Sequence, residues 1–104
     1  MLLGNVIGTV ISTCKEEELE GLKLLLVQGV NNLGKTNNEL VVCVDAVGAG
    51  IGELVMYASG SSARQTKITE NKPIDHVIMA IVDEITSENL VFFTKGLGFV
   101  KYWS

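Results

Sequence analysis

The fold is decided by one stretch, Val44-Asp-Ala-Val-Gly-Ala-Gly-Ile-Gly-Glu-Leu-Val-Met-Tyr-Ala-Ser-Gly-Ser-Ser-Ala-Arg64, which places two glycine-bearing turns around a short apolar run. Gly48, Gly50 and Gly52 stand close together, and glycine lets a backbone adopt positive φ or approach another backbone closely. This pattern is typical of a tight turn and not of a helix. The apolar residues after Glu53 predict a strand between the two turns.

Length and composition narrow the class of protein. The 104 residues suffice for a single domain with one hydrophobic core. Hydrophobic residues make up 47% of the chain and charged residues 19%, against about a quarter charged in a typical soluble domain. The net charge of −4 argues against a nucleic-acid-binding protein, which needs a basic face to neutralise phosphates.

The sequence shows no sign of a membrane or a secretion signal. No apolar run reaches the roughly 18 to 20 residues of a membrane-spanning helix. The N-terminus also lacks the basic segment and long apolar segment of a signal peptide. We therefore expect a soluble cytosolic protein without a membrane partner.

Cysteine and histidine are too scarce to suggest a metal site or a disulfide framework. Cys14 and Cys43 form no CxxC pair, and we expect both to be buried reduced thiols. His76 is the only histidine, so the chain lacks the usual ligand set of a Cys/His metal site. The prediction is that the protein uses no metal and no cofactor.

Strand signals dominate the whole chain. β-Branched residues from Val6 to Thr13 predict the first strand, with Gly4 and Gly8 on one face. Apolar runs predict further strands over residues 22–28, 40–47, 53–58, 77–82 and 90–94. Short strands separated by turn signals predict a mainly β protein, either a small antiparallel barrel or a sandwich.

The segments between the strands are polar. Residues 15–21 are expected to be a solvated connection, and residues 29–39 a polar loop. Ser61 or Ser62 is expected to cap a single helical turn over residues 63–67, since a serine side chain accepts from unpaired helix N–H groups. Asp75 is expected to cap a further short turn after Pro73.

Three predicted strands are apolar on both faces: Leu24–Val27, Leu40–Val44 and Val77–Val82. An antiparallel strand with one solvated face should instead alternate apolar and polar residues. Because so short a chain has no helical layer to cover the second face, another subunit is the simplest cover. We therefore expect a homo-oligomer.

Gly29–Thr36 formally matches the Walker A pattern G-x-x-x-x-G-K-[ST], and Val41–Asp45 imitates a Walker B strand. A phosphate-binding loop must open a helix, and parallel strands need a crossover of about a dozen residues. Only residues 37–39 lie between this pattern and the next apolar run, which leaves room for a hairpin alone. A polar hairpin loop is the prediction, and nucleotide binding is a distant alternative.

Two other glycine motifs also fail as active-site signatures. Gly48–Gly52 has the spacing GxGxG and precedes a strand, unlike a dinucleotide fingerprint. Gly60–Arg64 is not a G-x-S-x-G nucleophile elbow, because Arg64 stands where the second glycine belongs. A serine nucleophile would also need His76 as its base, and the Asp-His dipeptide after Pro73 is more typical of a surface turn. We therefore predict no catalytic residues.

Several segments together carry a family resemblance: Gly4–Thr13, Leu22–Gln28, Val44–Glu53, Gly60–Arg64, and Pro73–Asp75 running into Ile81–Ile85. In these segments the chain resembles the ethanolamine-utilisation/carboxysome vertex proteins of bacterial microcompartments. The turn GAGxGE followed by GSSAR is highly specific, and the resemblance extends to about Lys95. Residues 29–39 and the aromatic tail have no counterpart in it.

The resemblance implies a fold and an assembly. It implies an OB-like five-stranded antiparallel β-barrel with one or two short helical turns over residues 1–95, followed by a tail over residues 96–104. It implies a homopentamer that caps vertices of a microcompartment shell in the cytoplasm, beside hexameric shell proteins and encapsulated enzymes. Such a protein is structural and not an enzyme.

The type of compartment is an expectation from similarity. A metabolosome of the ethanolamine, propanediol or glycyl-radical type is expected, and a carboxysome is the alternative. An OB-type oligonucleotide-binding module is a distant alternative, because the aromatic residues lie mostly in the tail and not within a basic groove.

Two groups of residues are predicted to contact other subunits. The first, at the subunit interface or a central turn of the ring, comprises Asp45, Gly48, Ala49, Gly50, Gly52, Glu53, Ser61, Ser62 and Arg64. Within it, an ion pair of Arg64 with Asp45 or Glu53 is one reading, and three solvated side chains are the other. The second group, expected to dock on a neighbouring subunit, shell tile or cargo protein unless the terminus is disordered, comprises Phe99, Tyr102 and Trp103.

Overall fold

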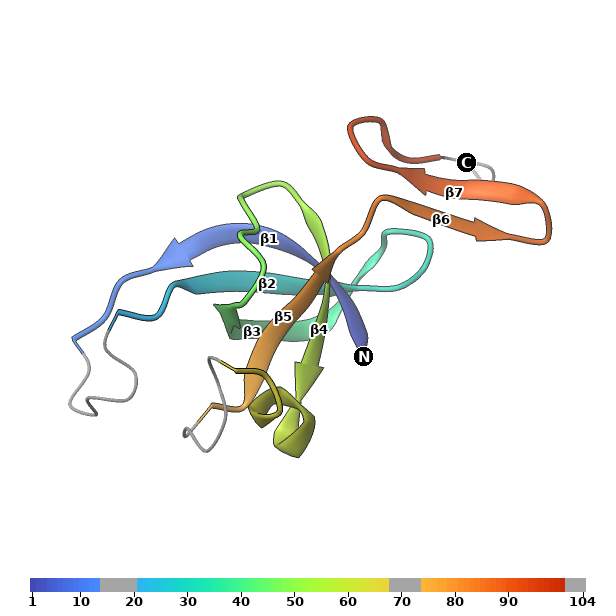
Figure 1. The fold of residues 1–104 in the computed structure, drawn as a ribbon. Helices are drawn as coiled ribbons and strands as arrows, with labels where there is room; N and C mark the ends of the chain where they lie inside the picture. Colours follow the sequence, from blue (N-terminus) through green and yellow to red (C-terminus); the bar gives the residue numbers. More distant parts are fainter. Residues whose placement is uncertain (14–20, 68–73, 101–104) are drawn as a thin grey trace.

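A computed structural model describes residues 1–13, 21–67 and 74–100. Five strands close into a barrel in the order β1-β2-β3-β5-β4 (Figure 1). They are β1 (Leu2–Val10), β2 (Leu24–Val30), β3 (Thr36–Asp45), β4 (Leu54–Ser59) and β5 (His76–Ile81). A single 3-10 helix in the described residues, η2 (Gly60–Arg64), follows β4.

A second sheet extends beyond one end of the barrel (Figure 1). It contains β6 (Glu84–Ser87), β7 (Leu90–Thr94) and β8 (Gly98–Phe99), and we call it the C-terminal sheet. The described chain is accordingly elongated, with extents of 47 × 23 × 23 Å and a radius of gyration of 14.5 Å. A compact domain of this length would have a radius of gyration of about 13 Å.

The small β-barrel predicted from the sequence is confirmed, but one of its strand pairs is parallel. β3 and β5 pair in parallel through Val44 with Val77 and Asp45 with Ile78, and the other pairs are antiparallel. An odd number of strands cannot alternate in direction all the way around a closed ring. The expectation of a wholly antiparallel barrel is therefore wrong at this one pair.

Strand positions agree with the prediction at β7 and differ elsewhere. β1 begins at Leu2 and ends at Val10, where the sequence predicted Val6 to Thr13. The predicted loop 29–39 is too long, since residues 29–30 belong to β2 and residues 36–39 to β3. The side chain of Gln28 donates to the carbonyls of Asn37 and Glu39 at 2.8 and 3.0 Å, which holds this polar part of the hairpin as strand.

The predicted caps are also wrong. Ser61 and Ser62 lie inside η2, whose N-cap position is taken by Ser59 without a side-chain hydrogen bond. Asp75 leads directly into β5, and its carbonyl accepts the N–H of Gly60 at 2.9 Å. Of the Asp-His dipeptide, His76 begins β5, while Asp75 lies in an exposed bend directly before the strand. Cys14 and residues 15–20 of the expected solvated connection lie outside the described residues, and Gly21 at its end is an exposed turn residue.

The buried residues form three clusters. The barrel core contains inward-facing residues from all five strands and Ala49 of the loop after β3. The η2 cluster joins Ala63 to the outer faces of Val44, Ala58 and Val77. The C-terminal cluster joins Phe93 of β7 to Val30, Leu54 and Val82. Successive strand residues point to opposite faces, so the last two clusters lie outside the barrel wall.

The buried thiol of Cys43 lies in the barrel core, as predicted. Its burial raises the pKa to about 12. Within the described residues, no helix has the length and apolar character needed to cross a bilayer. No group of three or more metal-ligating side chains occurs in this part of the chain.

Candidate subunit-contact site

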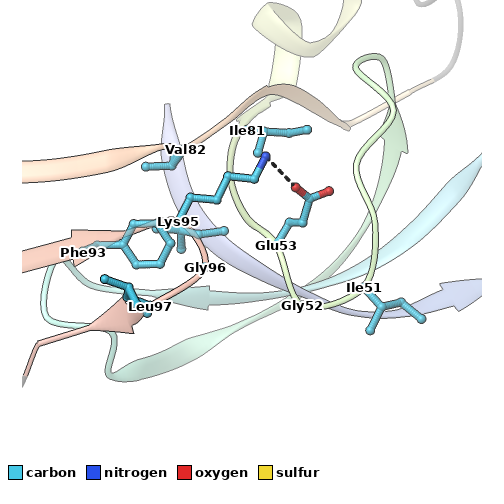
Figure 2. Close-up of a pocket in the computed structure, with 11 residues that line it drawn as sticks. Ile51, Gly52, Glu53, Ile81, Val82, Phe93, Lys95, Gly96 and Leu97 are labelled. Carbon is cyan, nitrogen blue, oxygen red and sulfur yellow. Dashed lines mark ion pairs between the residues drawn. The ribbon is translucent and has the colours of Figure 1, made fainter.

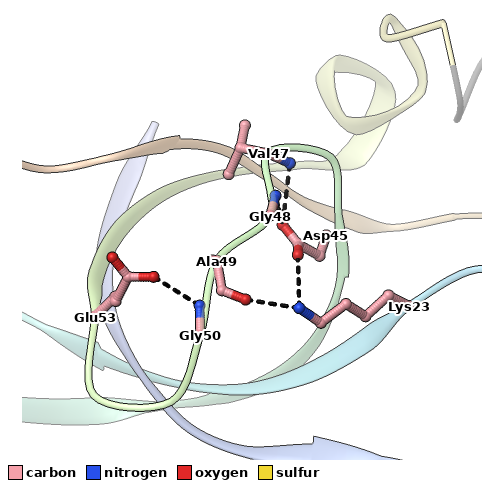
Figure 3. Close-up of polar contacts among 7 residues, drawn as sticks. All are labelled: Lys23, Asp45, Val47, Gly48, Ala49, Gly50 and Glu53. Carbon is pink, nitrogen blue, oxygen red and sulfur yellow. Dashed lines mark hydrogen bonds and ion pairs between the residues drawn. The ribbon is translucent and has the colours of Figure 1, made fainter.

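The turn between β3 and β4, residues 45–53, forms a loop that we call the glycine loop. Asp45 stands at the end of β3, and its side chain is 1% exposed. Its Oδ1 accepts the backbone N–H groups of Val47 and Gly48, both at 3.0 Å (Figure 3). The buried carboxylate therefore fixes the first half of the loop.

Lys23 and Glu53 fix the rest of the glycine loop. Lys23 Nζ lies 3.3 Å from Asp45 Oδ2 and donates to the carbonyl of Ala49 at 2.8 Å. Glu53 Oε1 accepts the N–H of Gly50 at 2.7 Å (Figure 3). The loop is thus held at its start, its middle and its end by side chains.

Two glycines give the loop its path. Gly48 has φ of 80° and Gly52 has φ of 92°, in the left-handed region that favours glycine. A Cβ atom at either position would meet nothing within 4 Å. These positions therefore favour glycine because of the positive φ, and not because another part of the same chain lies too close for a side chain.

The two carboxylates of the loop are held in the charged form. Burial alone would raise the pKa of Asp45, but the backbone N–H groups of the loop and Lys23 outweigh it and lower the pKa. The Gly50 N–H and then Lys95 lower the pKa of Glu53. Both side chains therefore act as fixed negative charges that organise a turn.

A groove of about 530 Å³ separates the glycine loop from the C-terminal sheet. Ile51 and Leu54 line one side, and Phe93 and Leu97 line the other. The Glu53–Lys95 ion pair, 3.2 Å long, lies within the groove (Figure 2). The groove is largely apolar, and its two charged side chains, Glu53 and Lys95, are paired with each other. It therefore suits packing against apolar side chains.

The structure does not pair Arg64 with Asp45 or Glu53 within one chain. Arg64 donates to the carbonyl of Ile74 at 3.0 Å and lies 3.6 Å from Oδ1 of Asp75. Its side chain is 38% exposed and that of Asp75 is 83% exposed. The predicted group of contact residues therefore divides into two places, the glycine loop and η2, which carries the exposed Ser61 and Ser62.

Phe99 is part of a sheet and not of a free tail. It lies in β8, where its ring centroid is 4.9 Å from that of Phe93 at a tilted angle. It also sits against Gly34 in the β2–β3 hairpin turn. Phe99 is thus half-buried by its own chain, while Tyr102 and Trp103 lie outside the described residues.

Sequence reasoning missed Lys23 and Lys95 as the partners of the two carboxylates. A signal for Lys23 existed, because an antiparallel β2–β3 hairpin that pairs Leu24 with Val44 brings Lys23 beside Asp45. The sequence gives no comparable indication that Lys95 lies near Glu53, because β6 and β8, the neighbours of β7 in the C-terminal sheet, are not recognisable from the sequence. The interpretation of the glycine loop as a tight turn followed by a strand is confirmed.

The fold and the side chains that brace its loops define a small OB-like barrel protein. Its sequence matches the model of the family described as ethanolamine utilisation protein EutN/carboxysome over residues 1–83. The chain therefore belongs to the EutN/CcmL family of microcompartment shell vertex proteins, as the sequence resemblance implied.

Relatives and solved structures agree along most of the chain. The bacterial microcompartment shell vertex protein EutN of Escherichia coli strain K12 is 39% identical over 95 residues, covering 91% of this chain and 100% of EutN. CcmL of Nostoc sp. PCC 7120 is 41% identical with a TM-score of 0.87, covering 91% of this chain and 100% of that structure. The pentameric microcompartment shell protein GrpN from Rhodospirillum rubrum is 45% identical with a TM-score of 0.76, covering 84% and 99%.

Proposed function

We propose that five copies of this chain form a closed ring that caps the vertices of a bacterial microcompartment shell. The likeness to GrpN, a protein named as a pentameric shell protein, supports this proposal at 45% identity over 84% of the chain. A lattice of flat hexagonal tiles closes into a polyhedron only where fivefold points are introduced. The ring supplies such a point beside hexameric shell proteins, with encapsulated enzymes as further partners inside the shell.

The role is structural and not catalytic. The charged side chains around the glycine loop are used to fix a turn, because Asp45, Lys23 and Glu53 bond to its backbone. The Glu53–Lys95 pair connects this turn to the C-terminal sheet. A rigid protomer of this kind suits a shell component whose function is to present a fixed shape.

The compartment is of the metabolosome type in this proposal. The 45% identity to GrpN, named as a bacterial microcompartment shell vertex protein, supports this type. Carboxysome CcmL proteins at 41% identity and EutN proteins at 38–39% keep the carboxysome as the alternative. The genes beside this one test the assignment, since shell proteins are normally encoded with the enzymes they enclose. Enzymes of ethanolamine, propanediol or glycyl-radical metabolism are expected there, and carboxysome genes would overturn it.

We also propose that the glycine loop and η2 contact neighbouring subunits. On the loop, Val47 and Ile51 are 39% and 66% exposed although the backbone between Asp45 and Glu53 is fixed. At the end of η2, Arg64 and its partner Asp75 both have exposed side chains, at 38% and 83%, so a second chain can contact either charge. Arg64→Ala should weaken the ring, and Arg64→Lys should weaken it less because the charge remains. A ring unchanged in Arg64→Ala would show that Arg64 makes no contact with a neighbouring subunit that stabilises the ring.

Native mass spectrometry of the purified protein tests the ring directly. We expect a species of five chains at micromolar concentration, and a monomer at that concentration would refute the proposal. Co-assembly with a hexameric shell protein tests the vertex role. Closed polyhedra should form only when both proteins are present, whereas closed shells of the hexameric protein alone would contradict it.

A further inference from the structure

The outer wall of the barrel carries three apolar areas, and the chain covers two of them. Ala63 of η2 covers the area around Val44 and Val77. Phe93 of the C-terminal sheet covers the area around Leu54 and Val82. The third area lies over the middle of β1, β2 and β3, and no described element of the chain packs on it.

We call this third area the bare wall, and it consists of Ile7, Leu26, Leu40 and Val42. Ile7 is 49% exposed, Leu40 is 55% exposed and Val42 is 44% exposed. All four residues are apolar, and none belongs to the three buried clusters of the described chain. The bare wall is therefore a continuous apolar surface in the isolated protomer.

Strand register brings these side chains together. Leu26 of β2 pairs with Val42 of β3. Leu40 stands two residues before Val42 in β3, so its side chain lies on the same face. On the other side Leu26 pairs with Gly8, which has no side chain to cover it. A register shift between Val6 and Gly8 places Ile7 at a bulge, and its side chain is exposed beside the bare wall.

We infer that the bare wall packs against a second copy of this chain, as one of the two faces that join neighbours in the ring. The inference rests on the proposed ring of five and names the surface that it uses. A ring with rotational symmetry joins unlike faces, because a face that pairs with itself gives a closed dimer. The counterpart of the bare wall is thus a different part of the neighbouring protomer.

The apolar composition of the bare wall is typical of a permanent interface between identical chains and not of a transient interface. Permanent interfaces between identical chains resemble a domain core cut in half and bury about 800 Å² or more per partner. Their centres are depleted of charge, and the bare wall contains no charged residue. Its β-branched and leucine side chains are held on three hydrogen-bonded strands, so little conformational entropy is lost when they are covered.

The test uses Val42→Glu in the full chain, with Leu90→Glu as the matched control. Leu90 is 47% exposed, close to the 44% of Val42, and it stands in β7 away from the bare wall. Val42→Thr is a milder variant that keeps the β-branched shape and adds a hydroxyl. Native mass spectrometry over a dilution series measures the concentration at which half of the rings dissociate, and circular dichroism reports whether each barrel is folded.

We expect Val42→Glu to raise the half-dissociation concentration at least about tenfold, Val42→Thr to raise it less, and Leu90→Glu to leave it unchanged. Coexpressed with the parent, Val42→Glu should also reduce the yield of closed rings, since its second face still binds a neighbour. If the parent forms rings and folded Val42→Thr and Val42→Glu form them equally well, this inference fails while the proposed function stands. If the parent itself is a monomer, the proposed function fails first.

Discussion

Lys23 Nζ lies 3.3 Å from Asp45 Oδ2, and the two side chains differ sharply in exposure, at 53% for Lys23 and 1% for Asp45. The pair is therefore unequal. Asp45 also accepts two backbone N–H groups, so its loss affects three donors at once. Lys23 can be replaced in part by water, because half of its side chain already faces solvent.

This inequality predicts different effects of removing each partner. Asp45→Ala should destabilise the folded protein by about 1–3 kcal/mol, because backbone donors of the glycine loop lose their acceptor. Lys23→Met should destabilise it by about 1 kcal/mol, since a half-exposed partner contributes less. Urea unfolding measures both, with the exposed Lys35→Met as the matched control. Equal effects of Lys23→Met and Lys35→Met would show that the pair does not contribute.

The lowered pKa values of Asp45 and Glu53 predict a loss of stability in acid. A carboxyl whose pKa is lower in the folded state than in the unfolded state stabilises the fold above its unfolded pKa, about 4 for these groups. That contribution is lost as the pH falls through the lower folded value. Urea unfolding between about pH 6 and 3 should show a shallower decline for Asp45→Asn than for the parent. Parallel curves would contradict this link between Asp45 and acid sensitivity.

The glycine loop shows how far sequence reasoning reached. The residues 45–53 were identified as a turn because glycine spacing is a local property of the chain. Within one chain the partner of Asp45 is Lys23 and that of Arg64 is Asp75, and this choice depends on strand register. Predicting the β2–β3 hairpin with its register would have been enough to find Lys23.

The C-terminal region was harder to predict for a physical reason. β6 is a short, largely exposed strand that contains Glu84 and Ser87, and β8 is only two residues long. Neither has an apolar pattern strong enough to be recognised, and both form because β7 lies between them and Phe93 is buried on the barrel. Phe99 lies in β8 only because β8 pairs with β7 and its ring packs on Phe93. The local sequence does not show these contacts, so it predicts a tail there. The expected domain boundary at residue 95 stays a prediction.

Gly34 offers a test of the contact between the β2–β3 hairpin and the C-terminal sheet. Its φ is 83°, and a Cβ atom there would lie 2.6 Å from the ring of Phe99. Gly34→Ala should therefore cost about 1–2 kcal/mol in backbone strain and a further penalty for displacing the ring.

The matched control for this change is Gly21→Ala. Gly21 has φ of 82°, and a Cβ atom there would meet nothing within 4 Å. Thermal unfolding should therefore show a larger loss for Gly34→Ala than for Gly21→Ala. Combining Gly34→Ala with Phe99→Ala should give less than the sum of the separate losses, because the clash is absent once the ring is removed. Additive losses would mean that Phe99 does not rest on this turn.

The raised pKa of Cys43 predicts an unreactive thiol in the folded protein. With a pKa of about 12, almost none of it is thiolate at pH 8, and the thiolate is the reactive form. N-ethylmaleimide should therefore leave Cys43 unmodified in native buffer and label it after unfolding in urea. Peptide mass spectrometry reads Cys43 separately from Cys14. Rapid labelling of Cys43 in native buffer would show that the barrel core opens readily.

Two truncations separate the structural role of Phe99 from the proposed contacts of Tyr102 and Trp103. Deleting residues 96–104 removes β8 and exposes Phe93, whose ring lies 4.9 Å from that of Phe99. The protomer should lose about 1–2 kcal/mol of stability, because part of the C-terminal cluster becomes exposed. Deleting only residues 101–104 leaves β8 in place and should not change protomer stability.

If Tyr102 and Trp103 anchor the chain to a neighbouring subunit, shell tile or cargo protein, the shorter deletion should still lower ring stability or incorporation into shells. Equal melting, ring formation and shell incorporation after that deletion would show that these two aromatic residues make no such contact.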